Sequence, residues 1–244
     1  MVCMAYLPRH SLIWDGALFH VTWQCHNHSW LLEKDWAKQL YYDLLIKFKD
    51  RYQVIFYSYH FMSNHIHLSG KIHGTKEAFS NFFRIVNSLF AKKVNQRLER
   101  CGQVVMDRFK SPVIQSDDAL LRVMVYQDLN SYRAKMVTHP RKYRWSSYHF
   151  YALGKKDMLL TPAPVYLNMG ASPTKRQEVY RQYVEDILET EGPQKQNYSQ
   201  TLYIGDPDWV QQRYKDIAQV KQLKRLAYLQ RQQRFYQSLQ RGSP

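Results

Sequence analysis

Cysteine is scarce in this chain. The three cysteines, Cys3, Cys25 and Cys101, are an odd number, lie far apart and include no Cys-x-x-Cys pair. A disulfide framework and a structural zinc knuckle are therefore not expected. The pattern is consistent with a reducing cytoplasm.

The chain also lacks a long apolar run. It has no stretch of about 18 apolar residues, and its N-terminus has no charged segment followed by an apolar one. Neither a membrane span nor a signal peptide is therefore expected. We expect a cytoplasmic protein without a membrane partner.

Acidic residues are few relative to basic ones. Asp and Glu number 20 against 35 Lys and Arg, which gives a formal net charge of +15. Such an excess favours a polyanionic partner, and nucleic acid is the first candidate.

The order of the expected elements indicates the fold class. Alternating and aromatic-rich runs predict strands at residues 18–25, 54–62, 66–72 and 113–115, and helical spacing predicts helices at 34–50 and 76–98. This β-α-β-β-α-β order is the split arrangement of ferredoxin-like domains. It predicts an α+β fold with an antiparallel sheet and helices on one face.

His65 and His67 are separated by one apolar residue, within the strand expected at 66–72 and the turn before it. On a strand, residues two apart project from the same face, so the two imidazoles would form a pair of nitrogen ligands. Such a pair suits several divalent metals and leaves coordination positions open for catalysis. The simpler interpretation is two surface histidines on an amphipathic strand.

A helix that begins near Asp117 carries the second group of candidate residues. Asp117 or Asp118 can cap its start, and Tyr126 and Asn130 lie four apart on one face. If that face meets the histidine strand, a phenol and an amide oxygen converge on the same metal. Alone, the tyrosine and asparagine spacing indicates little.

Several separated motifs carry a resemblance to a known family. They are Gly16 to Thr22, Met62 to Leu68, Asp107 to Lys110, Tyr126 to Asn130 with Arg133 and Ala134, and Trp145 to Tyr148. Over about residues 12–150, the chain resembles the REP-associated tyrosine transposases, a branch of the HUH single-tyrosine transposases. Ser63 and Ser131 stand where that family usually has proline.

The resemblance implies a metal-dependent enzyme of DNA transposition and recombination. Mg²⁺ or Mn²⁺ would be held by His65, His67 and, by resemblance, Asn130, while Tyr126 attacks a phosphate to form a 5′-phosphotyrosine intermediate. The substrate would be single-stranded DNA beside a palindromic REP hairpin, in a bacterial, nucleoid-associated setting. Both a monomer and a homodimer remain open.

Three segments are expected on this basis. Residues 1–152 would form the HUH catalytic domain, residues 153–208 an accessory helical segment and linker, and residues 209–244 a basic, helical C-terminal tail.

Contacts with DNA are expected from basic clusters with interleaved aromatic residues, because cations bind phosphates and aromatic rings stack on bases. The candidates are Lys92, Lys93, Arg97, Arg108, Lys110, Arg133, Lys135, Arg141, Lys142, Arg144 and Trp145, with Tyr132 and Tyr143 interleaved.

Other interpretations remain at this stage. Each basic cluster alone is also typical of a solvated helix face. The main alternative function is a non-catalytic nucleic-acid binder in which the histidines are ordinary. A zinc protein would use His26 and His28 with the main pair, and an HUH relaxase would gather three histidines where this chain has Asn130.

Overall fold

The computed structural model of the chain describes residues 13–190 and 198–241. Cys3 and most of the linker expected at 192–200 lie outside the described residues, and the last three residues of that linker form a 3₁₀ helix, Tyr198–Gln200. The chain divides into two compact units, one up to Ile204 and one from Gly205. Much of the segment expected to be accessory, residues 153–204, therefore belongs to the first unit.

A five-stranded sheet forms the centre of the first unit, in the order β2-β3-β1-β4-β5. The strands are β1 (Leu18–Gln24), β2 (Val54–Phe61), β3 (His65–Ile72), β4 (Val113–Ile114) and β5 (Tyr203–Ile204). The first four pair antiparallel, in the order of a ferredoxin-like domain. The α+β prediction is confirmed, while the parallel pairing of β5 with β4 was not predicted.

The helices extend the expected pattern. They are α1 (Asp35–Lys49), α2 (Lys76–Arg97), α3 (Asp117–Asp128), α4 (Asn130–Arg133), α5 (Tyr148–Leu153), α6 (Pro164–Leu167) and α7 (Pro173–Thr190). The second unit contains α8 (Pro207–Arg241), in agreement with the predicted helical C-terminal extension. In the described part of the chain, no helix is long and apolar enough to cross a membrane.

One face of the sheet is apolar and covered by α1 and α2. Phe19 on β1 packs on Phe79 and Phe83 of α2, with ring centroids 5.0 and 6.4 Å apart. Trp23 donates to the Tyr41 hydroxyl of α1 over 2.7 Å. Burial of these large rings supplies much of the driving force for this layer.

The opposite face is polar and covered by α3. Strand alternation places His20, Ser58 and His67 on this side, and Ser58 donates to the amide oxygen of Gln127 on α3 over 2.7 Å. The prediction of helices on one face therefore holds for α1 and α2, whereas α3 lies across the sheet from them. Because hydrogen bonds require a specific distance and direction, these buried polar contacts fix the position of α3 more narrowly than apolar packing would.

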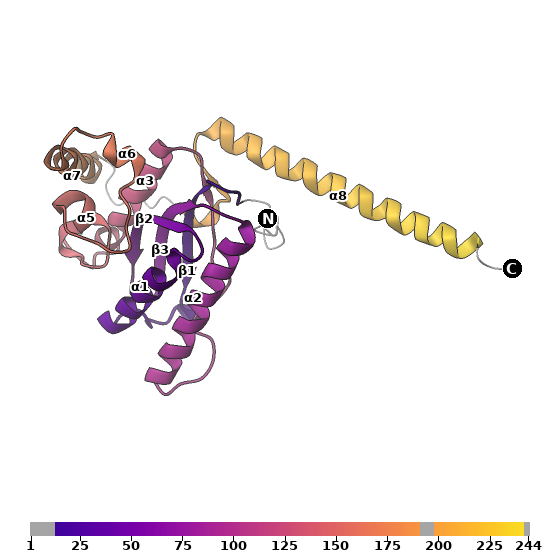
Figure 1. The fold of residues 1–244 in the computed structure, drawn as a ribbon, viewed down its shortest axis with the longest axis horizontal. Coiled ribbons are helices and arrows are strands. Elements are labelled where there is room, and N and C mark those ends of the chain that lie inside the picture. The colour runs from indigo at the N-terminus through magenta and orange to yellow at the C-terminus, as the bar shows by residue number, and fades with distance from the viewer. Residues whose placement is uncertain (1–12, 191–197, 242–244) are drawn as a thin grey trace. The chain divides into compact units, whose positions relative to one another are not determined.

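A second core holds α3 against the later helices. Helices α5, α6 and α7 cluster with α3 on one side of the sheet (Figure 1). The buried Asp128 of α3 accepts from the Ser147 hydroxyl at 2.9 Å and the Tyr180 hydroxyl at 2.8 Å. Burial raises the pKa of Asp128 to about 7. Two helices distant in sequence thus anchor the end of the helix that carries Tyr126.

The start and the end of α3 differ from the sequence prediction. Ser116, rather than Asp117 or Asp118, caps the helix by accepting from the Ala119 amide at 3.3 Å. The helix ends at Asp128, and Asn130 begins α4. The Arg133 amide still bonds to the Leu129 carbonyl at 2.9 Å, so the chain continues along a similar path.

Candidate functional site

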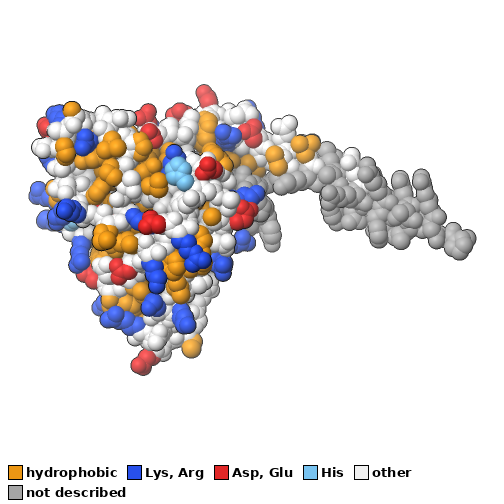
Figure 2. Space-filling view, in the orientation of Figure 1, with side chains coloured by type: hydrophobic (Ala, Val, Ile, Leu, Met, Phe, Trp, Pro, Cys, Tyr) orange, Lys and Arg blue, Asp and Glu red, His pale blue; other side chains and the backbone are white. Residues whose placement is uncertain are grey.

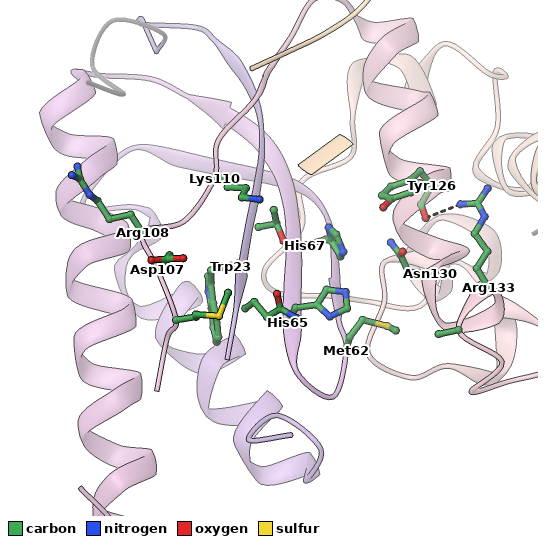
Figure 3. A pocket seen from close by; sticks show the side chains of 14 residues that line it. Trp23, Met62, His65, His67, Asp107, Arg108, Lys110, Tyr126, Asn130 and Arg133 are labelled. Atoms are coloured by element: carbon green, nitrogen blue, oxygen red, sulfur yellow. Dashed lines mark hydrogen bonds between the residues drawn. The ribbon is translucent and has the colours of Figure 1, made fainter. Parts of the chain in front are cut away.

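A pocket of about 450 Å³ opens where β1, β3 and the segment before β4 face the end of α3 and α4. Among its lining residues are His65, His67, Tyr126, Asn130, Arg108, Lys110 and Arg133. Figure 3 shows the two histidines between Tyr126 on one side and Lys110 on the other. The structure therefore brings the predicted metal ligands, the predicted nucleophile and three predicted DNA-contact residues into one cavity.

His67 is buried and held by a neighbouring histidine. Its Nδ1 lies 3.0 Å from Nε2 of His20 on the adjacent strand β1. Burial, reinforced by the nearby His65, lowers the pKa of His67 well below its ordinary value. His67 is thus a neutral imidazole near neutral pH, which is the form that binds a metal.

His65 is half-buried and held by its sequence neighbour. Its Nδ1 lies 2.6 Å from the amide oxygen of Asn64. Because a carbonyl oxygen only accepts, Nδ1 of His65 is the donor in this contact, and in the neutral ring that tautomer has its lone pair on Nε2. Both histidines therefore contact the protein through Nδ1.

Tyr126 is 8% exposed and lies against the histidines. Its ring meets that of His67 edge-on, with centroids 5.9 Å apart. Burial raises the pKa of the Tyr126 phenol, and the nearby Arg133 opposes that rise. The Arg133 guanidinium lies 5.5 Å from the ring centroid and donates to the Tyr126 carbonyl at 3.4 Å.

Asn130 completes the candidate metal ligands. Its Nδ2 is buried without a hydrogen-bond partner among the described residues. Rotation of the Asn130 side-chain amide exchanges its oxygen and its nitrogen. The amide oxygen can therefore occupy this unpaired position and face a ligand. Two imidazoles and one amide oxygen fit a divalent cation that keeps other positions for water or phosphate.

Acidic ligands are absent from this set. Over the described ranges, no three His, Cys, Asp or Glu side chains form a group that could hold a metal. His26 and His28 accordingly do not join the main pair as the zinc alternative requires. They lie in a 3₁₀ turn after β1, where Nδ1 of His28 is 2.7 Å from the Gln24 amide nitrogen.

The far wall of the pocket contains two cationic side chains, Arg108 and Lys110, with the carboxylate of Asp107 beside them. Arg108 and Lys110 are exposed on the segment that leads to β4. Backbone hydrogen bonds of 3.0 and 2.8 Å between Thr22 and Lys110 join this segment to β1. The backbone that carries both cations is therefore held opposite the tyrosine, where their side chains suit the phosphates of a bound strand.

Other predicted DNA-contact residues lie outside this pocket. Lys92, Lys93 and Arg97 are exposed on α2, as are Lys135, Arg141, Lys142 and Arg144 after α4. Arg97 stacks over Trp36 at 4.4 Å, and Arg144 lies 3.8 Å from Asp35. Figure 2 shows Lys and Arg spread over the visible face with Asp and Glu between them.

Trp145 and Tyr143 do not have the exposure that the sequence predicted. They are 6% and 8% exposed, and their polar atoms are used internally. Trp145 Nε1 donates to Asp35 at 2.6 Å, and the Tyr143 hydroxyl donates to the Phe61 carbonyl at 2.6 Å. Their segment pairs with the edge of β2, so these rings pack in the fold and are unavailable for stacking on bases.

Sequence reasoning missed the residues that hold the histidines. His20 stands out only as the titratable residue in the centre of β1, and Asn64 only as the residue before His65. Met62 and Gln24 also line the pocket. Strand alternation shows that His20 shares a face with His67, but the pairing of β1 with β3 is needed to bring the two together.

His60 gives a stability prediction that is independent of function. Its ring is fully buried on β2 and stacks on Tyr143 at 4.8 Å. Burial is the main cause that lowers the pKa of His60 to about 3 from 6.5. The contribution of neutral His60 to the free energy of unfolding is therefore fully present above the pKa that His60 has in the unfolded chain. It is lost as the pH falls toward the pKa that His60 has in the folded protein.

We expect His60→Phe to reduce acid destabilisation. When the pH falls from about 7 to about 4, the variant should lose about 3 kcal/mol less free energy of unfolding than the unmodified protein. The figure follows because each pH unit below the unfolded pKa of His60 costs about 1.4 kcal/mol. Urea unfolding followed by circular dichroism at both pH values measures this. The same pH dependence in variant and unmodified protein would contradict the assignment.

The fold and the pocket together define a class, an α+β ferredoxin-like domain with a histidine pair on the inner strand β3 and a tyrosine helix across from it. Among solved structures, the chain is similar to a REP-associated tyrosine transposase bound to a REP hairpin, with a TM-score of 0.52 and 16% sequence identity. The match covers 65% of this chain and 92% of that one. No protein-family model and no curated sequence matches the chain. At this identity, the likeness establishes the fold.

Proposed function

We propose that the protein is a metal-dependent single-stranded DNA endonuclease and strand transferase of the transposase type. The observation that carries the proposal is the pocket in which Tyr126, His65 and His67 lie across from Arg108 and Lys110 (Figure 3). The structural similarity to a transposase supports it. The protein would act in bacterial DNA transposition or recombination, in association with the nucleoid.

Tyr126 would be the nucleophile. Its Oη forms a bond to the scissile phosphorus while the bond from phosphorus to the 3′ oxygen breaks, which leaves a 5′-phosphotyrosine and a 3′-hydroxyl once the oxygen takes up a proton. Because the phosphodiester energy is kept in the new bond, a second 3′-hydroxyl can reverse the step. Cutting and rejoining then require no nucleoside triphosphate.

His65, His67 and Asn130 would hold Mg²⁺ or Mn²⁺. When bound, the cation offsets charge on the nonbridging phosphate oxygens. Arg133 would help Tyr126 to lose its phenol proton. Burial raises the pKa of Tyr126, and the Arg133 guanidinium beside the ring lowers it. Arg108 and Lys110 would bind the flanking phosphates and orient the strand for in-line attack.

The proposed substrate is single-stranded DNA beside a palindromic hairpin. The similar transposase was solved with a REP hairpin, which supports this choice. The pocket suits an unpaired strand, because Tyr126 lies inside it with only 8% of its surface exposed. A duplex backbone reaches such a recessed group less easily than a flexible single strand.

The direct test incubates the protein with labelled single-stranded hairpin DNA and Mg²⁺ or Mn²⁺. A labelled band that survives denaturation and migrates with the protein supports the proposal, and the same DNA annealed to its full complement is the control. DNA binding without an adduct under any metal condition would favour the non-catalytic nucleic-acid binder. Equal cleavage of the duplex would count against the single-strand mechanism.

Deleting residues 209–244 is expected to separate binding from chemistry. This tail has far more Lys and Arg than Asp and Glu, so its loss should weaken DNA binding and flatten the salt dependence of affinity. The pocket lies within the first unit and should keep its metal requirement. Fluorescence anisotropy across a salt series measures the slope, and an unchanged slope would mean that the tail does not contact DNA.

A further inference from the structure

His20 is a buried polar residue that the proposed reaction does not use directly. It lies on β1 with none of its surface exposed, and its ring is nearly parallel to that of His67, 5.3 Å between centroids at 13°. Its Nε2 is 3.0 Å from Nδ1 of His67. A leucine or phenylalanine would fill this position without burying polar atoms, so the histidine calls for a polar role.

We infer that His20 is a positioning residue for His67, which accepts a hydrogen bond from Nδ1–H of His67 and so holds Nε2 of that ring unprotonated for a divalent cation. This inference rests on the proposed function, since it assumes that His67 is a metal ligand. The inference adds His20 as a residue that holds the ligand His67 in place without contacting the metal itself. Such supporting contacts commonly fix both the tautomer and the ring plane of a histidine ligand.

The direction of the hydrogen bond follows from what metal binding by His67 requires. A hydrogen bond over 3.0 Å between two imidazole nitrogens needs one proton between them, so one ring donates and the other accepts. If His20 donated it, His67 would carry its own proton on Nε2 and could not bind a metal through that atom. Metal binding therefore requires His67 to donate and His20 to carry its proton on Nδ1.

The His20 ring is held in place on both sides. Its Nδ1 is buried without a hydrogen-bond partner among the described residues, so its hydrogen bonding is directed to His67. On another side, its ring meets Tyr126 edge-on at 6.5 Å. The His20 ring thus lies against both the candidate ligand and the candidate nucleophile.

The other candidate ligand is held in the same way from a different element. Asn64 accepts from Nδ1 of His65, while its own amide nitrogen points to the His28 carbonyl at 3.5 Å. Both histidines are therefore engaged at Nδ1 by a protein acceptor. This shared arrangement is what a metal site that uses both Nε2 atoms requires.

The test compares three variants in Mn²⁺ binding, followed by the loss of the free Mn²⁺ signal in electron paramagnetic resonance. His20→Phe keeps a ring of similar size but removes the acceptor, and we expect its Mn²⁺ affinity to fall about 10- to 100-fold. His20→Gln places an amide oxygen near the former Nε2 and should restore affinity to within a few-fold. His60→Phe is the matched control, because it removes a buried histidine that lies opposite His67 on the adjacent strand β2 but makes no hydrogen bond to it among the described residues. It should leave the affinity unchanged.

A second measurement uses the unmodified protein. Nitrogen-15 chemical shifts of the histidine rings with Mg²⁺ present should show His67 protonated at Nδ1 and unprotonated at Nε2. Protonation at Nε2 would overturn the inference, even if His20→Phe failed to fold. So would equal Mn²⁺ affinity in His20→Phe and unmodified protein, or an equal loss in His20→Phe and His60→Phe. If the unmodified protein bound no Mn²⁺, the proposed function itself would fail.

Discussion

Tyr126→Phe is expected to abolish both DNA cleavage and the covalent adduct while DNA binding stays within about twofold. Only the nucleophilic oxygen is lost, so the bond to phosphorus cannot form. The ring contacts with His67, His20 and Tyr198 are made by carbon atoms and should remain. Denaturing gels with labelled hairpin DNA measure the adduct, and anisotropy measures binding.

Tyr132→Phe is the matched control for this experiment. Tyr132 lies on α4 and is partly exposed, but it does not line the pocket that contains His65 and His67. Its hydroxyl should be dispensable for the adduct. An adduct that persists in Tyr126→Phe and disappears in Tyr132→Phe would show that the nucleophile is assigned to the wrong tyrosine.

His65→Ala is expected to remove metal-dependent cleavage, with a loss of at least about 100-fold in rate at low Mn²⁺. The half-buried His65 contacts Asn64 and lines the pocket, so its loss should leave the core packed. His67→Ala should have the same effect on cleavage but also lower stability, because His67 is buried and bonded to His20. Cleavage rates across a Mn²⁺ titration, with melting temperatures alongside, separate the two effects.

Asn130→Ala is expected to cost less than either histidine change. A neutral amide oxygen is a weaker ligand than imidazole, so the defect should appear mainly as a raised metal requirement that excess Mn²⁺ offsets. Undiminished cleavage by the unmodified protein in EDTA would rule out the metal role for all three residues. It would leave Tyr126 to be tested separately.

The strand that carries the histidines shows how local pattern leads to structure. Alternation in β3 alone predicts that His65 and His67 share a face and that Ile66 lies on the other. The same rule applied to β1 places Phe19 opposite His20. The element order then predicts the ferredoxin-like sheet, and the structure confirms it. The roles of the site residues stay predictions.

Other features depended on which segments meet. Trp145 is buried where its ring stacks on Phe61 and its Nε1 donates to Asp35, both distant in sequence, and no local pattern distinguishes such a ring from an exposed one. The parallel strand β5 also joins β4 from far along the chain. Both outcomes reflect long-range pairing, whose free energy comes from partners that a short window of sequence does not contain.

The sequence by itself determined the strand faces, the helix that carries Tyr126 and the basic excess, because each depends on residues within a few positions or on composition. Only the tertiary structure decided that α3 packs on the histidine face, that Asp128 anchors it through Tyr180, and that His20 supports His67. These contacts join residues far apart in the chain. They exist because the folded sheet and helices exclude water from one shared interface, where buried polar groups must find partners.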